Sequence, residues 1–150
     1  MASATYDDVN LILKLYELRR DPKLREARDW FGSQLKARTF SEFLEQCPPG
    51  SQGNVYVRMV SSYWDMVASF IVSGVLNEEL FFQSGGEMLG CWVKLREIVP
   101  DMREMMKNPF IAKNLEEVAG RYATWLNKHA PGAFEAMITA MTSQANAPRS

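Results

Sequence analysis

The chain has 150 residues, of which 47% are hydrophobic, and a formal net charge of −1. This length is enough for one domain with its own core, and this composition excludes a largely disordered chain. The near-zero charge argues against nucleic acid or an acidic membrane surface as a partner of the chain as a whole. We therefore predict one helical domain over residues 1–142 and a flexible polar tail over residues 143–150.

The first predicted helix begins after Thr5, where Asp8 completes a capping-box pattern, and ends near Arg20. Its apolar residues form two stripes, one made of Val9, Ile12, Leu13 and Tyr16, and a second made of Leu11, Leu15 and Leu18. A helix that is apolar on two faces can bury one face in the core and the other against a partner. We predict that Leu11, Leu15 and Leu18 form the interface of a homodimer.

A second helix is predicted to start at Asp21 and Pro22, and a short third one to cover residues 42–46. Residues 14–38 contain eight basic and four acidic side chains, the one basic bias in the chain. This pattern favours a solvated outer helix face, because acidic residues interrupt the positive charge. We therefore predict no nucleic-acid partner, and a nucleic-acid contact through residues 19–38 is the remaining alternative.

A helix over residues 55–71, closed by Gly74, is apolar over more than half of its circumference. Its polar residues form a narrow seam, which we call the polar seam: Arg58, Ser61, Ser62, Asp65 and Ser69. Such a helix must be surrounded by other helices. The predicted fold is therefore all-α, an irregular bundle of about six or seven helices around this buried central helix. Because the loops are short, sequential helices are expected to pack roughly antiparallel.

The rest of the chain also follows a helical pattern. Asn77 caps a helix that Gly85 and Gly86 bend or break, and the pattern resumes at Glu87 with a kink expected at Pro100. Two further helices follow, separated at Pro131. Five of the nine methionines lie late in the chain: Met102, Met105, Met106, Met137 and Met141. They are expected either to fill gaps in the core or to form an adaptable binding surface.

Asp65 lies in the middle of the most buried predicted helix, where an unpaired carboxylate costs several kcal/mol. We predict that Asp65 pairs with Arg103 or Arg58 as a buried structural ion pair. The alternative is a ligand pocket between the central helix and the helix of Trp92, in which Asp65, Tyr63 and Arg103 orient a small molecule on an apolar wall.

Residues with catalytic or metal-binding chemistry do not form a recognisable pattern. His129 is the single histidine, and the two cysteines, Cys47 and Cys91, have no accompanying base or disulfide spacing. We expect Cys91 to be buried and Cys47 to be the more accessible of the two. No catalytic residue, metal or cofactor is predicted, and an enzyme is the less favoured class.

The sequence also favours a soluble location. No basic and then apolar segment marks a signal peptide at the N-terminus. The uncharged apolar run at residues 66–77 is too short to cross a bilayer. Unpaired cysteines fit a reducing compartment. We therefore expect a cytoplasmic protein without a membrane partner.

Four segments together resemble an uncharacterised family: Tyr63-Trp64-Asp65, residues 74–80 from Gly74 to Leu80, Trp92-Val93-Lys94-Leu95, and Pro100 with Arg103. They are similar to the bacterial family known as domain of unknown function 4760, over roughly residues 55–125, with Asp65 in place of the more usual glutamate. The resemblance implies a helical fold, a bacterial cytoplasmic origin and a structural couple of Asp65 and Arg103. It implies no activity.

These observations lead to three functional hypotheses. The leading one is a non-enzymatic helical interaction protein that associates with itself through its first helix. The alternative is a domain that senses a small-molecule ligand through a pocket near Asp65. Nucleic-acid binding through the basic helix face is the third.

Overall fold

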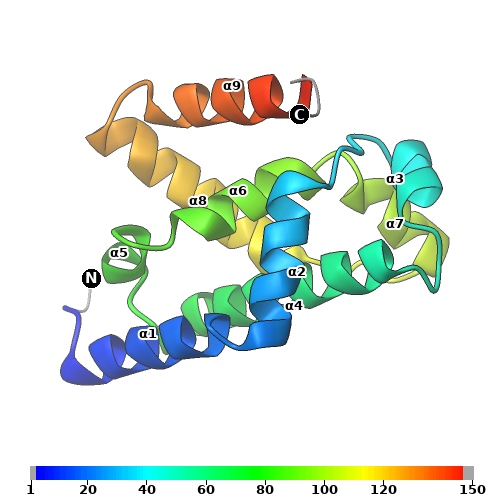
Figure 1. The fold of residues 1–150 in the computed structure, drawn as a ribbon. Helices are drawn as coiled ribbons and strands as arrows, with labels where there is room; N and C mark the ends of the chain where they lie inside the picture. The colour runs from blue at the N-terminus through cyan, green and yellow to red at the C-terminus, as the bar shows by residue number, and fades with distance from the viewer. Residues whose placement is uncertain (1–2, 147–150) are drawn as a thin grey trace.

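The computed structural model describes residues 3–146, and within this range the chain is helical without a strand (Figure 1). The described residues form nine helices: α1 (Tyr6–Arg19), α2 (Pro22–Ser33), α3 (Phe40–Gln46), α4 (Gln52–Val72), α5 (Glu78–Phe82), α6 (Gly86–Leu95), α7 (Val99–Met106), α8 (Lys113–His129) and α9 (Ala133–Asn146). The predicted all-α bundle is confirmed. Its helices outnumber the six or seven expected because the chain breaks at Gly85, where a bend or a break was expected, and again before Pro100, where a kink was expected.

The central helix of the bundle is α4, as predicted, and it begins three residues earlier than expected. Ser51 caps it by accepting a hydrogen bond from the backbone N–H of Asn54, and Gly74, at a φ of +82°, reverses the chain after it. Figure 1 shows α2 crossing α4, with α8 on the other side, and these two helices make its most extensive contacts. The main packing therefore joins helices that are distant in sequence, rather than the sequential antiparallel pairs that we expected.

Helix α1 buries a face that draws on both predicted stripes, with Leu11 and Leu15 from one and Ile12 from the other. Leu15 is 5% exposed in the core and Leu11 is half-buried against it, whereas Leu13 is 58% exposed. The exposed apolar side chains of α1 are Tyr6, Val9, Leu13, Tyr16 and Leu18. The prediction that Leu15 lies in an interface is therefore wrong, because the core of the same chain covers it, whereas Leu11 is half-buried and Leu18 is exposed.

Asp8 lies on the inward face of α1. It is the one buried charged residue among those described, and it forms the predicted capping box with Thr5. Its second carboxylate oxygen accepts a hydrogen bond of 2.8 Å from the backbone N–H of Asn77, at the start of α5. A buried carboxylate needs such partners. Asp8 therefore ties the start of α1 to a segment nearly seventy residues later.

We expect Asp8 to make the protein sensitive to acid. The backbone N–H groups of Thr5 and Asn77 lower the pKa of Asp8 below its usual 3.8, so the folded state favours the carboxylate. The resulting stabilisation is present above about pH 4 and is lost as the pH falls through the lowered pKa. Thermal unfolding measured between pH 7 and pH 2 should show that the melting temperature of Asp8→Asn falls less on acidification than that of the wild type. The exposed neighbour variant Asp7→Asn is the control, and an identical loss in Asp8→Asn and the wild type contradicts this role.

Lys94 anchors α6 to the end of α2. Its ammonium donates hydrogen bonds to the carbonyl oxygens of Phe31, at 2.7 Å, and Gly32, at 3.0 Å. A cation at this position compensates the negative end of the α2 dipole. Burial, and next the charges of Arg38 and Lys36, lower the pKa of Lys94 to about 8.

The C-terminal part of the chain is built on α8, which packs against α6 and α9 as well as α4. Phe82, Tyr122 and Trp125 form a ring cluster, and the Tyr122 hydroxyl donates to the carbonyl oxygen of Phe82 at 2.5 Å. Helix α9 continues to Asn146, into the predicted tail of residues 143–150, whose last four residues lie outside the described range. Within that range, no helix combines the length and the apolar character needed to span a membrane.

Candidate functional site

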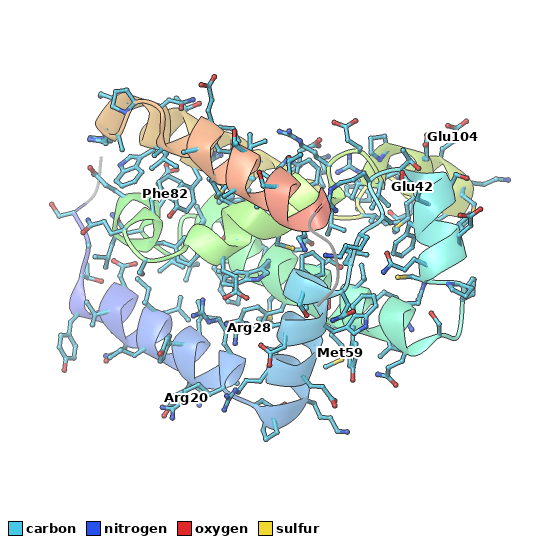
Figure 2. All side chains as sticks on the ribbon, turned by 45° about the horizontal axis from the view of Figure 1, so that its top comes forward. Arg20, Arg28, Glu42, Met59, Phe82 and Glu104 are labelled. Atoms are coloured by element: carbon cyan, nitrogen blue, oxygen red, sulfur yellow. The ribbon has the colours of Figure 1, made fainter. Side chains whose placement is uncertain are left out.

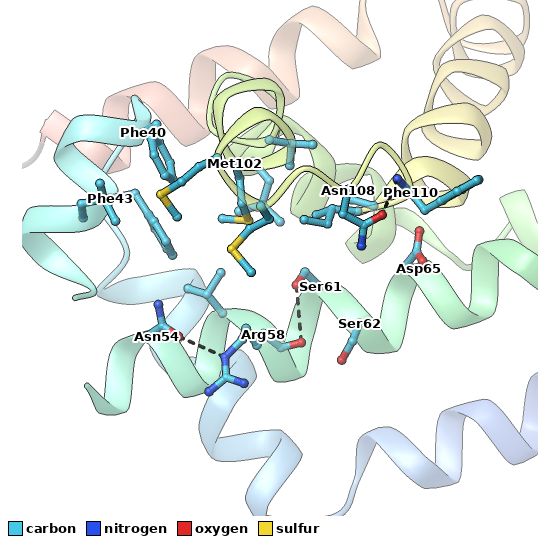
Figure 3. A pocket seen from close by; sticks show the side chains of 18 of the residues that line it. Phe40, Phe43, Asn54, Arg58, Ser61, Ser62, Asp65, Met102, Asn108 and Phe110 are labelled. Atoms are coloured by element: carbon cyan, nitrogen blue, oxygen red, sulfur yellow. Dashed lines mark hydrogen bonds between the residues drawn. The ribbon is translucent and has the colours of Figure 1, made fainter. Parts of the chain in front are cut away.

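A groove with a volume of about 640 Å³ lies beside the polar seam of α4. Arg58, Ser61, Ser62 and Asp65 follow one another along one wall of the groove, as Figure 3 shows. These positions recur at the spacing of a helix face, so a single face of α4 supplies the whole wall. Ser69, the last member of the predicted seam, is not part of the lining.

The opposite wall is aromatic and rich in methionine. Helix α3 contributes Phe40 and Phe43, and the segment between α7 and α8 contributes Phe110. The methionines of this wall all come from α7: Met102, Met105 and Met106. Phe110 is 68% exposed and Met105 is 53% exposed, so a large apolar surface faces solvent here. Exposed apolar surface of this kind marks binding sites, and methionine adapts its shape to a ligand.

Arg103 positions the methionine wall. Its Nε donates to the carbonyl oxygen of Ile111 at 2.8 Å, and its Nη1 lies 3.2 Å from a carboxylate oxygen of Glu116 on α8. Lys107 ends α7 in the left-handed conformation, which turns the chain toward α8. Arg103 thus acts behind the groove and is not among the described residues that line it.

Asp65 does not form the predicted ion pair. Its Oδ1 accepts a hydrogen bond of 2.9 Å from the backbone N–H of Leu115, in the first turn of α8. Helix α8 has no side-chain cap of its own, because Ala112 occupies its N-cap position. The carboxylate therefore satisfies one of the free N–H groups and the positive end of the α8 dipole. The positive partner of Asp65 is a helix terminus, which the sequence pattern of α4 alone could not show.

Arg58 lies at the rim of the groove. Its side chain is exposed, and its Nε donates to Oδ1 of Asn54 at 3.0 Å, one turn earlier on α4 (Figure 3). The Asn54 amide group in turn donates to the carbonyl oxygen of Cys47 at 3.1 Å. Among the described side chains of the lining, Arg58 and Asp65 are the charged ones, and they stand at different positions along the seam.

Tyr63 and Trp92 lie away from this groove. The buried Tyr63 hydroxyl donates to the carbonyl oxygen of Leu15 at 2.6 Å, and burial is the main cause that raises the pKa of Tyr63 to about 12. Trp92 is half-buried against the core. The structure therefore brings Asp65 and Arg58 to one groove. Tyr63 and Trp92 are not part of the lining, and Arg103 lies behind the groove because its guanidinium binds Ile111 and Glu116.

The remaining chemical candidates are isolated. Both cysteines are free thiols, and burial raises the pKa of each. Cys91 is buried as expected, but the expectation that Cys47 is accessible is wrong, because it is fully covered. His129 is exposed, with its ring centroid 4.8 Å from that of Trp125. Among the described residues, no three metal-binding side chains gather in one place.

One comparison with known proteins gives a match. The model of the family described as Domain of unknown function (DUF4760) matches residues 4–122. The chain belongs to this family. The match confirms the resemblance found in the sequence and extends it toward the N-terminus, from near residue 55 to residue 4. Neither the search of curated proteins nor the search of solved structures gives a match.

The DUF4760 match covers the whole candidate site. It spans α1 to α7 and most of α8, and it ends at Tyr122 within α8. Both walls of the groove therefore belong to the matched region, whereas α9 lies beyond it. The aromatic residues of the groove were missed in the sequence. The spacing of Phe40 and Phe43, three residues apart on a short helix, is the signal that could have identified them.

Proposed function

We propose that this DUF4760 protein is a binding domain for a small amphiphilic anion, a molecule with an apolar body and one acidic group. The groove beside the polar seam carries this proposal. Its volume of about 640 Å³ suits a small ligand, and its lining is mainly apolar with a few polar groups at one side. Ligand sensing, the alternative raised by the sequence, thereby becomes the leading hypothesis.

The order of charge along α4 supports an anion and its orientation. Arg58 and Asp65 are seven residues apart, which places them about 10 Å apart along the helix axis. The carboxylate of Asp65 is engaged with the N-terminus of α8, whereas two nitrogen atoms of the Arg58 guanidinium have no protein partner within the described residues. An acidic group is therefore attracted to the Arg58 end and repelled from the Asp65 end. The apolar body then lies along the methionines and phenylalanines.

Dodecanoate is the probe that we choose for the test, in isothermal titration calorimetry below its micelle concentration. Dodecyltrimethylammonium has the same alkyl chain with a positive head group, and we expect it to bind more weakly than dodecanoate. Arg58→Gln should weaken dodecanoate binding by about fivefold, the effect of one exposed charge pair. Met105→Lys should weaken it by about tenfold or more, because a cation then replaces apolar surface in the groove.

Met66→Lys is the matched control for Met105→Lys. Met66 is also an exposed methionine, but it lies on α4 outside the groove. Equal weakening by Met66→Lys and Met105→Lys contradicts the proposal, and so does the absence of any heat from dodecanoate with the wild-type protein.

Self-association is a second candidate function, supported by the exposed apolar face of α1. Tyr6, Val9, Leu13 and Tyr16 recur at helical spacing on this face, and Leu18 is exposed beside them. A homodimer that uses this face would bury it and leave Leu11 and Leu15 in each core. Light scattering should then show that Leu13→Glu converts a dimer into a monomer, and a wild-type monomer excludes this candidate.

We also propose a bacterial cytoplasmic location for the protein. Two free, buried thiols fit a reducing compartment. The bacterial origin rests on the family resemblance alone.

A further inference from the structure

A second cavity, of about 440 Å³, lies where α1 ends and α2 begins. Its lining, which we call the arginine corner, consists of Tyr16, Arg19, Arg20, Arg25 and Arg28. The chain turns sharply at Asp21 between the two helices (Figure 1), so two arginines from the end of α1 meet two from α2. Figure 2 shows Arg20 and Arg28 at this corner. Four of the eight basic residues of segment 14–38 thus meet at one place.

The arginine corner has an excess of positive charge. None of the described side chains that line it is acidic. Glu87 on α6 is the neighbouring carboxylate that partly compensates it: Glu87 binds Arg28 through two bonds of 2.6 and 2.8 Å, and it lies 3.6 Å from Arg19. Arg20 and Arg25 are exposed and make no ion pair within the described residues. Among the described residues, Glu87 is thus the one carboxylate in ion-pair contact with these four guanidinium groups, and Asp29 adds a weaker electrostatic attraction to Arg28.

Two of the four arginines are held in place by the fold. Besides its bonds to Glu87, Arg28 donates from Nη1 to the carbonyl oxygen of Arg19 at 3.0 Å. The Arg19 guanidinium lies over the rings of Tyr16, at 5.2 Å, and Trp64, at 5.4 Å, and its Nε has no acceptor among the described residues. Cations that are already positioned lose less conformational entropy when a ligand binds. The arginine corner is thus ordered at its base and open at its rim.

We propose that the arginine corner binds a small ligand that carries at least two phosphate groups. Guanidinium groups match phosphate oxygens in geometry and remain charged at physiological pH. The volume of about 440 Å³ lies within the range of small-molecule sites, so it holds more than a single phosphate. This site is separate from the groove beside the polar seam and does not depend on the function proposed for that groove.

Inorganic pyrophosphate is the probe for this site, titrated calorimetrically at constant ionic strength against the full-length protein. We expect the double variant Arg20→Gln, Arg25→Gln to weaken binding by about tenfold or more. These two exposed arginines make no ion pair, so their replacement should leave the fold intact. The control variant Lys14→Gln, Lys23→Gln removes the same charge from exposed positions on α1 and α2 outside the cavity, and it should bind pyrophosphate like the wild type.

Two results overturn the proposal. One is the absence of pyrophosphate binding to the wild-type protein together with the absence of vesicle binding. The other is equal weakening by the two double variants, because binding would then depend on net charge and not on the arginine corner.

A second arm of the experiment separates two sources of phosphate, a soluble molecule and a lipid headgroup. Vesicles of phosphatidylcholine with and without phosphatidic acid are sedimented with the protein. Pyrophosphate binding without vesicle binding identifies a soluble ligand. Binding that requires phosphatidic acid and is lost in Arg20→Gln, Arg25→Gln identifies a lipid surface, on which neighbouring headgroups supply the phosphates.

Discussion

Replacing Leu15 by glutamate is expected to abolish cooperative folding. Leu15 is 5% exposed and its carbonyl oxygen accepts the hydrogen bond of the buried Tyr63 hydroxyl, so this position lies inside the contact between α1 and α4. A carboxylate placed there without a partner costs several kcal/mol. That cost is comparable with the whole stability of a domain, about 5–15 kcal/mol. Circular dichroism with thermal unfolding should show the loss of a cooperative transition.

Leu13→Glu is the matched variant on the other face of the same helix. Leu13 is 58% exposed, so a charge at this position remains in water and should change the stability by about 0.5 kcal/mol or less. If Leu13→Glu unfolds the protein and Leu15→Glu does not, α1 is turned the other way, with Leu11, Leu15 and Leu18 facing outward as the sequence pattern suggested.

The second large effect is expected at Asp65. Asp65→Ala removes the acceptor of the Leu115 N–H and leaves the first turn of α8 without its cap, because Ala112 cannot replace it. Hydrogen bonds to charged groups contribute about 1.5–3 kcal/mol, so the free energy of unfolding should fall by about this amount. Urea denaturation monitored by tryptophan fluorescence measures it.

Two further variants test the cause of this loss. Asp65→Asn keeps an oxygen acceptor and should lose less stability than Asp65→Ala. Ser62→Ala changes another residue of the polar seam, whose hydroxyl contacts the carbonyl oxygen of Met59 within α4 itself. An equal change in Asp65→Ala and Ser62→Ala would show that the bond to α8 does not hold the two helices together.

Much of the fold could be predicted because it depends on local signals. The capping box of Thr5 and Asp8, the cap at Asn77 and the glycine after α4 each act within a few residues, and the structure contains all three. The buried character of α4 follows from its composition. The orientation of α1 could not be predicted, because it depends on a bond between Asp8 and Asn77 across nearly seventy residues.

The candidate site was predicted only in part, for the same reason. The polar seam was visible in the sequence, because its residues share one helix face. The elements that pack against that face could not be predicted, because α3, α7 and the N-terminus of α8 come from other parts of the chain. Asp65 has a positive partner, as predicted. The sequence suggested Arg58 or Arg103 for this role, whereas in the structure the partner is the N-terminus of α8.

The most direct test of ligand binding in the groove is amide-resolved NMR of the isotopically labelled full-length chain, titrated with dodecanoate. We expect the shift changes to concentrate along the polar seam of α4, around Ser61, and on the facing residues Met105 and Phe110. Helix α1 and the arginine corner should be unaffected. Shift changes concentrated on α1, or none at any concentration below the micelle threshold, would contradict the proposed binding site.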